Sequence, residues 1–156
     1  MRVRLIAVGS RMPKWVREAY EDYITRLSAA LKISLVEIEA GPRGGTRTPQ
    51  KAMEAEGQKL LAALRKDDYV VALDEHGSQM TTRELAGWLK ARMQDGRDLA
   101  FLIGGPDGFS PGVLERSDLK WSLSRLTFPH ALVRVVLAEQ LYRAHGVLAN
   151  HPYHRD

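Results

Sequence analysis

The chain has 156 residues, of which 44% are hydrophobic and 27% are charged, as in an ordinary globular domain. It contains no cysteine, which excludes disulfides, thiolate metal sites and cysteine nucleophiles. No apolar run approaches the roughly 18 residues of a membrane span, and the apolar part of the N-terminus is too short for a secretory signal. We therefore expect one cytosolic domain, residues 1–156, without a membrane segment.

The charge of the chain is mildly basic and unevenly distributed. The net charge is +4, and the isoelectric point is near 9.5. Residues 1–51 contain ten Lys and Arg against five Asp and Glu, and residues 111–156 contain six against four. The middle of the chain, residues 52–110, is acidic, with seven Lys and Arg against ten Asp and Glu. Basic ends of this kind suit a phosphate-backbone partner, although many proteins that never bind nucleic acid have a similar charge.

Short apolar runs alternate with segments of helical periodicity along the chain. Strands are predicted at residues 3–8, 33–38, 69–73, 99–103 and 119–123. Helices are predicted at 14–31, 50–64, 82–93 and 131–148, with start signals at Pro13, Thr48-Pro49 and Thr81 to Glu84. The continuous apolar character of the strands is typical of a parallel sheet with helices on both faces, so the predicted fold class is α/β.

The last predicted helix is apolar around most of its circumference, which indicates burial on more than one side. Either it is central in the fold, or one face meets a second subunit, and an isologous homodimer is the simplest such arrangement. Glu139 and Arg143 lie four residues apart on this helix and are predicted to pair.

A tail of unusual composition, residues 150–156, follows this helix. It contains His151, Tyr153, His154 and Arg155, whereas chain ends normally contain small or charged filler. This density of proton-transfer, aromatic and anion-binding groups indicates a tail that is held in place and used. A disordered end is the alternative.

Three loops follow predicted strands at the carboxyl edge of the sheet, where open parallel sheets bind their ligands. They are residues 74–77, 104–109 and 124–130. The glycines at 104 and 105 would let the backbone approach a ligand closely and present its N–H groups. The alternative for this loop is a tight turn in which Pro106 presets the backbone.

Several common catalytic and binding patterns are missing from the sequence. The glycine loop matches neither a Walker loop nor a dinucleotide turn, and no G-x-S-x-G elbow occurs. Ser122 and Ser124 are therefore interpreted as loop residues that hydrogen-bond to the backbone. The five histidines show no known metal-binding spacing, so no metal site is expected.

The chain resembles the ribosomal RNA large subunit methyltransferase H family, whose members are small SPOUT-class enzymes, because four motifs occur in it in the same order as in that family. The motifs are residues 101–108 (FLIGGPDG), 122–130 (SLSRLTFPH), 132–144 (LVRVVLAEQLYRA) and 150–155 (NHPYHR). The opening residues 7–9 (AVG) and 12–15 (MPKW) also match, and the similarity extends over the whole chain.

This resemblance implies a fold, a reaction and a partner. The family transfers a methyl group from S-adenosylmethionine to N3 of a pseudouridine in the helix 69 stem-loop of 23S rRNA. Its fold is an α/β domain with a deep C-terminal trefoil knot, it acts as a homodimer, and recognition of assembled ribosomes is expected. The family's cofactor-binding positions fall on Leu73, Gly104, Leu123, Ser124, Arg125, Leu126, Thr127 and Phe128. Arg125 and Phe128 are mild departures from the family pattern.

The tail then becomes the candidate catalytic segment. His154 is the candidate base for the N3 proton, Arg155 would bind a ring carbonyl or phosphate, and Tyr153 would stack on the base or donate a hydrogen bond. Glu139 and His130 are weaker candidates for the base. Because SPOUT sites lie near the subunit interface, we expect the tail of one subunit to complete the pocket of the other.

Two other classes of function remain open at this point. The chain could be a ribosome-associated or RNA-binding factor with a SPOUT-like scaffold and no catalysis. It could also be a small-molecule enzyme built on a flavodoxin-like sheet. The basic ends of the chain favour the functions that involve RNA over the small-molecule enzyme.

Overall fold

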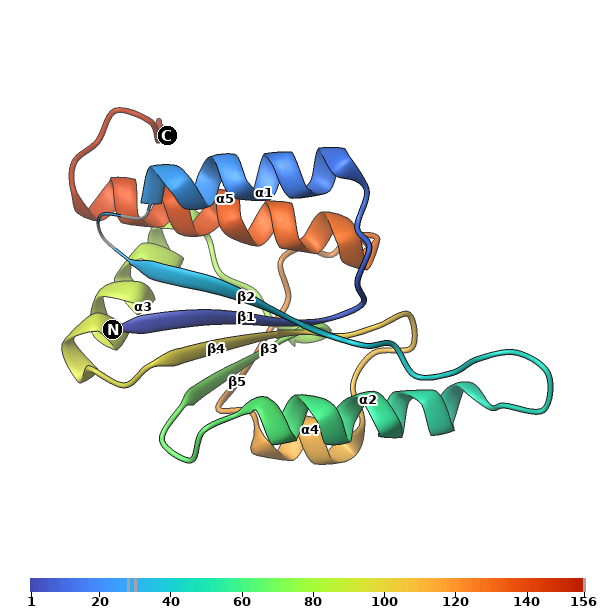
Figure 1. Cartoon of the computed structure of the whole chain (residues 1–156). Helices are drawn as coiled ribbons and strands as arrows, with labels where there is room; N and C mark the ends of the chain where they lie inside the picture. Colours follow the sequence, from blue (N-terminus) through green and yellow to red (C-terminus); the bar gives the residue numbers. More distant parts are fainter. Residues whose placement is uncertain (28, 30, 156) are drawn as a thin grey trace.

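Strands and helices alternate along the chain in the computed structural model, which describes residues 1–27, 29 and 31–155 (Figure 1). Positions 28, 30 and 156 lie outside the described residues. The first two fall in the predicted helix 14–31, and the third is the last residue of the tail 150–156. The elements, in chain order, are β1 (Arg2–Val8), α1 (Lys14–Leu27), β2 (Lys32–Ile38), α2 (Pro49–Ala63), β3 (Tyr69–Ser78), α3 (Thr82–Asp95), β4 (Leu99–Ile103), α4 (Pro111–Arg116), β5 (Leu119–Trp121) and α5 (His130–Leu148).

The five strands form one parallel sheet in the order β2-β1-β4-β3-β5. Its central strand, β4, is buried at all five positions, which explains why its sequence is a continuous apolar run. The predicted parallel sheet is therefore confirmed.

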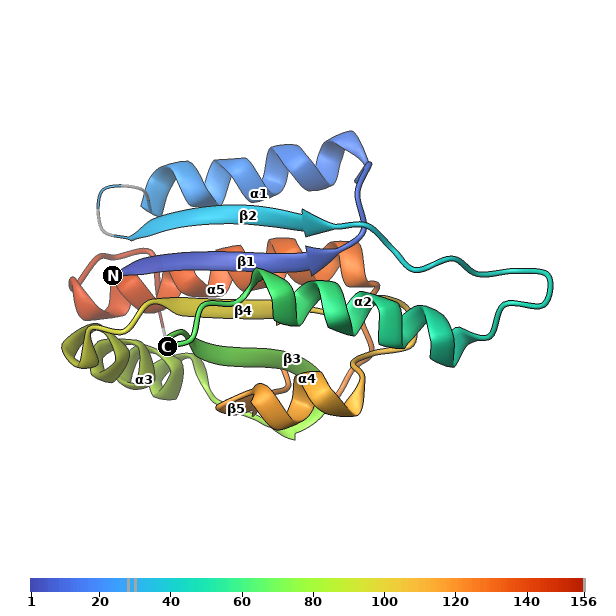
Figure 2. The ribbon, with the colours of Figure 1, turned by 60° about the horizontal axis from the view of Figure 1, so that its bottom comes forward.

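Helices cover both faces of this sheet, as predicted (Figures 1 and 2). Side chains alternate between the two faces along a strand, so neighbouring residues of β1 enter different cores. Leu5 packs with α1, α3 and α5, whereas Ile6 packs with α2 and α4. None of the helices in the described part of the chain is long and apolar enough to cross a membrane.

Two of the three predicted helix start signals are confirmed by side-chain hydrogen bonds, whereas Pro13, predicted as the first helical residue, directly precedes α1. The side-chain oxygen of Thr48 accepts from the amide of Lys51 at 3.2 Å, and that of Thr81 accepts from the amide of Glu84 at 3.1 Å. Gly96 ends α3 with a positive φ of 81°, a conformation that favours glycine.

The structure differs from the predicted elements in four main respects. Helix α1 ends at Leu27 instead of residue 31, and β5 ends at Trp121 instead of residue 123. The short helix α4 was not predicted, because six residues are too few to show a helical period. Residues 74–77, predicted as a loop, continue β3 as far as Ser78. Gly77 permits this, since a Cβ there would lie 2.5 Å from the carbonyl carbon of Lys120 on β5.

Candidate cofactor site and C-terminal cluster

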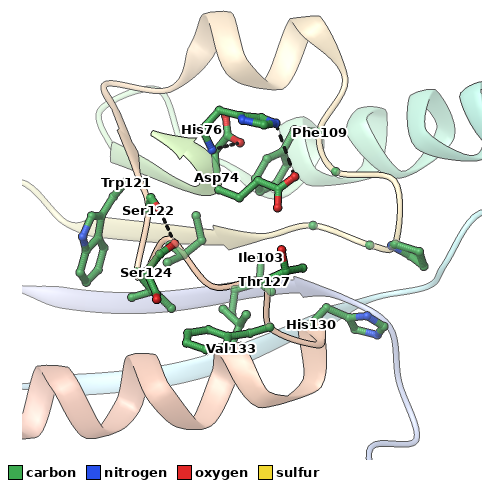
Figure 3. Close-up of a pocket in the computed structure, with 18 of the residues that line it drawn as sticks. Asp74, His76, Ile103, Phe109, Trp121, Ser122, Ser124, Thr127, His130 and Val133 are labelled. Atoms are coloured by element: carbon green, nitrogen blue, oxygen red, sulfur yellow. Dashed lines mark hydrogen bonds and ion pairs between the residues drawn. The ribbon is translucent and has the colours of Figure 1, made fainter. Parts of the chain in front are cut away.

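The three segments predicted to bind a ligand meet at the carboxyl edge of the sheet and enclose a cavity of about 430 Å³ (Figure 3). Seven of the eight predicted cofactor-binding residues line this cavity: Leu73, Gly104, Leu123, Ser124, Leu126, Thr127 and Phe128. Arg125 is the exception and is not among the lining residues. Other lining residues come from the end of β4, from β5 and from the first turn of α5.

The glycine loop at residues 104–109 is both a tight turn and a wall of the cavity. The amide of Gly108 donates to the carbonyl of Gly105 at 3.1 Å, and Gly108 has a φ of 82°. A Cβ on Gly104 would lie 3.3 Å from the carbonyl group of Gly108 and from the ring of Phe109. The two interpretations offered by the sequence are therefore compatible, because the turn places glycine backbone against the cavity.

The loop that follows β5 is held by its own serines. The hydroxyl of Ser122 donates to the carbonyl of Ser124 at 2.8 Å. The hydroxyl of Ser124 accepts from the amide of Leu126 at 2.9 Å. The interpretation of both serines as backbone-bonding loop residues is confirmed.

The walls of the cavity are apolar and part of its rim is acidic. Leu73, Ile103, Phe109 and Val133 are among the apolar lining residues, as are Trp121 and Phe128. Carboxylates of Asp74, Glu75 and Asp107 also line it. One Asp74 oxygen accepts from the amide of His76 at 3.1 Å, and Glu75 lies 3.4 Å from the His76 ring. Such a site suits a flat ring between apolar walls and a positive group at the rim.

The C-terminal tail is folded back onto α5, as its composition predicts. The hydroxyl of Tyr153 donates to Glu139 Oε1 at 3.1 Å. The guanidinium of Arg143 pairs with the same oxygen at 2.6 Å and lies 4.6 Å from the centre of the Tyr153 ring. The predicted Glu139–Arg143 pair is therefore confirmed. Arg155 is exposed.

These contacts determine the proton positions in the cluster. Burial, followed by a hydrogen bond with Tyr23, raises the pKa of Tyr153 to about 12. The hydrogen bond to Glu139 raises the pKa of Arg143. Arg143 Nη1 lies 3.4 Å from His154 Nδ1. Because a guanidinium can only donate, Nδ1 accepts, and a neutral His154 ring holds its proton on Nε2.

Aromatic residues that the sequence analysis did not select also hold the tail. The Tyr142 ring lies 4.6 Å from the Tyr153 ring in an edge-on arrangement, and it contacts Tyr23 of α1 at 6.1 Å. The signal was present for Tyr142, since positions 139, 142 and 143 share one face of a helix. Nothing in the sequence pattern connects Tyr23 with the tail.

The cavity and the tail are not brought together within one chain. The cavity reaches Val133, in the first turn of α5, whereas Tyr153 contacts Glu139, about 9 Å further along the helix at 1.5 Å per residue. None of the described tail residues lines the cavity. In the first half of α5, Leu132, Val135 and Val136 remain only partly buried.

Among the described residues, no group of three or more His, Asp or Glu side chains is arranged to hold a metal ion. His130 lines the cavity, so it is the one histidine of α5 close to the candidate cofactor site. It approaches Gly9, where a Cβ would lie 3.9 Å from its Nε2.

Known proteins match this chain over its whole length. The family described as "Predicted SPOUT methyltransferase" matches residues 1–154. A protein named "Ribosomal RNA large subunit methyltransferase H" from Stenotrophomonas maltophilia (strain R551-3) is 56% identical over 155 residues, which cover 99% of both chains. Proteins of the same name from Alkalilimnicola ehrlichii and Thioalkalivibrio sulfidiphilus are 54% and 53% identical, covering at least 99% of each chain. The chain therefore belongs to the SPOUT methyltransferases, in the family of the ribosomal RNA large subunit methyltransferases H.

Proposed function

We propose that this protein transfers a methyl group from S-adenosylmethionine to N3 of a pseudouridine in the helix 69 stem-loop of 23S rRNA. The proposal rests chiefly on one observation: three separate segments of the chain meet in one cavity at the carboxyl edge of the sheet. The relatives are named as methyltransferases of large-subunit ribosomal RNA, which supports the reaction class and the RNA substrate. Such a substrate would place the protein in the cytoplasm. A C-terminal trefoil knot is part of the same proposal.

The residues of the cavity fit the proposed cofactor. Leu73, Ile103 and Phe128 would pack against the adenine ring, and the Gly104-Gly105 backbone would approach it closely. The carboxylates of Asp74 and Glu75 would favour a ligand with positive charge. When bound, S-adenosylmethionine supplies an electrophilic methyl group on a sulfonium.

The substrate base requires separate groups, and we propose that the tail supplies them. N3 of pseudouridine is a weak acid between two carbonyls, so its attack is favoured by removal of the N3 proton or by stabilisation of the anionic ring. His154 would take the proton, Arg155 would bind a ring carbonyl or phosphate, and Tyr153 would stack on the base. The Arg143 contact gives His154 a defined tautomer, in which the lone pair is on Nδ1 and would take the substrate proton once Arg143 releases it.

We further propose that each active site combines one subunit's cavity with the tail of its partner. Within one chain the tail packs along α5, away from the cavity. The partly buried Leu132, Val135 and Val136 would pack against the second subunit of a homodimer. A dimer formed through α5 would bring the tail of one subunit toward the other subunit.

A methyl-transfer assay tests the proposal directly. Purified protein is incubated with labelled S-adenosylmethionine and one of three substrates prepared from cells that lack the enzyme: naked 23S rRNA, free large subunits or assembled ribosomes. We expect label at N3 of the helix 69 pseudouridine, chiefly with assembled ribosomes. Ribosome binding without transfer would instead identify a non-catalytic factor. Binding of neither cofactor nor ribosomes would point to a small-molecule enzyme.

A further inference from the structure

One side chain outside the cavity links the basic loop between β2 and α2 to the glycine loop of the cavity. This basic loop, residues 41–47, projects from the sheet and returns to α2 (Figure 2). Its first residue lies directly on that helix, because a Cβ on Gly41 would be 2.5 Å from the carbonyl oxygen of Ala52. The base of the loop is therefore fixed against α2.

A buried carboxylate anchors this contact. Glu56 of α2 is only 1% exposed. Its Oε2 accepts from the amide of Gly41 at 2.9 Å and from Arg43 Nη1 at 2.7 Å, and its Oε1 accepts from Arg43 Nη2 at 3.2 Å. A buried carboxylate requires such compensation, so Arg43 is held in one orientation.

The other edge of the same guanidinium bonds to a residue that lines the cavity. Arg43 Nε donates to Asp107 Oδ2 at 3.0 Å, and Asp107 lies in the turn between Gly105 and Gly108. The two carboxylates together raise the pKa of Arg43, with the Glu56 hydrogen bond as the largest cause. Arg43 itself does not line the cavity, whereas Asp107 does.

The glycine loop is also in direct contact with the anchor. A Cβ on Gly105 would lie 3.0 Å from Glu56 Oε1 and 3.2 Å from a methyl group of Val8. The absence of a side chain at this position lets the loop approach both α2 and β1. Glu56 thus contacts the bases of both loops, and Arg43 bridges them.

We propose that Arg43 is a positioning residue for the cofactor. By holding Asp107 against α2, it keeps the 104–109 turn in the shape that encloses the cavity. It also fixes the position of Asp107, the rim carboxylate with which it pairs. The inference rests on the proposed function, in that the cavity is taken to bind S-adenosylmethionine.

The test compares Arg43→Gln with Arg47→Gln, a matched control in the same loop with the same change of charge. Arg47 is exposed, and no salt bridge is found for it among the described residues. We expect Arg43→Gln to weaken S-adenosylmethionine binding by about threefold to tenfold in calorimetry, the range typical of residues that act through a neighbour. Arg47→Gln should leave the dissociation constant unchanged. An unchanged constant for Arg43→Gln would overturn the proposal.

Two further measurements separate positioning from simple loss of stability. In Asp107→Asn protein, Arg43→Gln should cause little additional loss of binding, because its effect passes through Asp107; fully additive losses would contradict this route. In the transfer assay, Arg43→Gln should raise KM for S-adenosylmethionine with kcat nearly unchanged at saturation. If KM stayed unchanged while kcat and thermal stability both fell, Arg43 would have a structural role only.

Failure of the proposed function would give a different result. If the unmodified protein did not bind S-adenosylmethionine, the cofactor assignment itself would be wrong. Hydrogen exchange at residues 104–109 would then still test the bridge. Faster exchange there in Arg43→Gln than in Arg47→Gln is expected, and equal rates in the two variants would refute the contact itself.

Discussion

Single side chains in the tail determine which groups are available for chemistry. Arg143 donates to Nδ1 of His154, so this nitrogen can accept a substrate proton only when Arg143 moves aside. The opposite nitrogen, Nε2, has a proton and could donate to a ring carbonyl. His154 can therefore act as a base or as a hydrogen-bond donor, and the two roles respond differently to substitution.

Replacement of His154 by alanine and by glutamine distinguishes these roles. If His154 is the base, both variants should lose about 10²-fold to 10⁴-fold in kcat, because neither side chain can take the proton. S-adenosylmethionine affinity and thermal stability, measured in parallel, should remain close to those of the unmodified protein. A glutamine variant that kept most of the activity would show that a donor suffices and that the base lies elsewhere.

The Tyr153 hydroxyl should remain protonated through the range in which enzymes of this kind are assayed. Its pKa is raised from 10.0 to about 12, so the folded state favours the phenol over the phenolate. The associated stabilisation is fully present below pH 10 and is lost as the pH rises toward 12. The difference in ultraviolet absorbance between the unmodified protein and Tyr153→Phe should therefore show phenolate only above pH 11 or so. A titration centred on the ordinary tyrosine pKa would contradict the packing of the tail.

Helix α5 connects the two candidate regions of the site. Its first turn lines the cavity, and its middle turns hold the tail through Glu139 and Arg143. The inward face of the helix is completely buried at Leu137 and Leu141. The helix should therefore keep its place without the tail, and the functions of cavity and tail should be separable.

Truncation after Leu148 tests this separation. The shortened chain should bind S-adenosylmethionine with nearly unchanged affinity, because none of the described tail residues lines the cavity. Methyl transfer to ribosomes should be abolished, since the groups proposed to hold and deprotonate the base are gone. Transfer that survived the truncation would eliminate the tail as the catalytic segment.

At the level of the whole molecule, the separation of tail and cavity predicts complementation between defective subunits. One subunit has Gly104→Val, which forces a side chain against the Gly108 backbone and should close the cofactor site. The other is truncated after Leu148. Each variant alone should be inactive, and subunit exchange should restore activity, because a mixed dimer contains one intact cavity facing one intact tail.

The same mixture has a clear negative outcome. If a chain used its own tail, no mixed dimer would contain a complete site, and activity would not return. Sizing of the mixture with differently tagged subunits establishes that exchange has occurred. Full activity of an unmodified monomer at micromolar concentration would equally exclude a shared site.

The sequence by itself determined the sheet and the segments around the cavity. Continuous apolar runs such as 99–103 predicted buried parallel strands, and strand ends followed by Gly104 predicted a binding edge, since these signals are local. The family motifs then assigned seven residues that do line the cavity. Arg125 was assigned by the same motif, but it is not among the residues that line the cavity, although Ser124 and Leu126 on either side of it are.

Features that depend on contacts between residues distant in sequence were decided by the tertiary structure alone. The extension of β3 through residues 74–77 requires β5 beside it, and α4 is too short to be predicted from its own sequence. The bridge from Glu56 through Arg43 to Asp107 joins residues up to 64 positions apart, and no periodicity links them. The placement of the tail depends in the same way on Tyr23 and Tyr142, because packing free energy is gained only when segments remote in sequence meet.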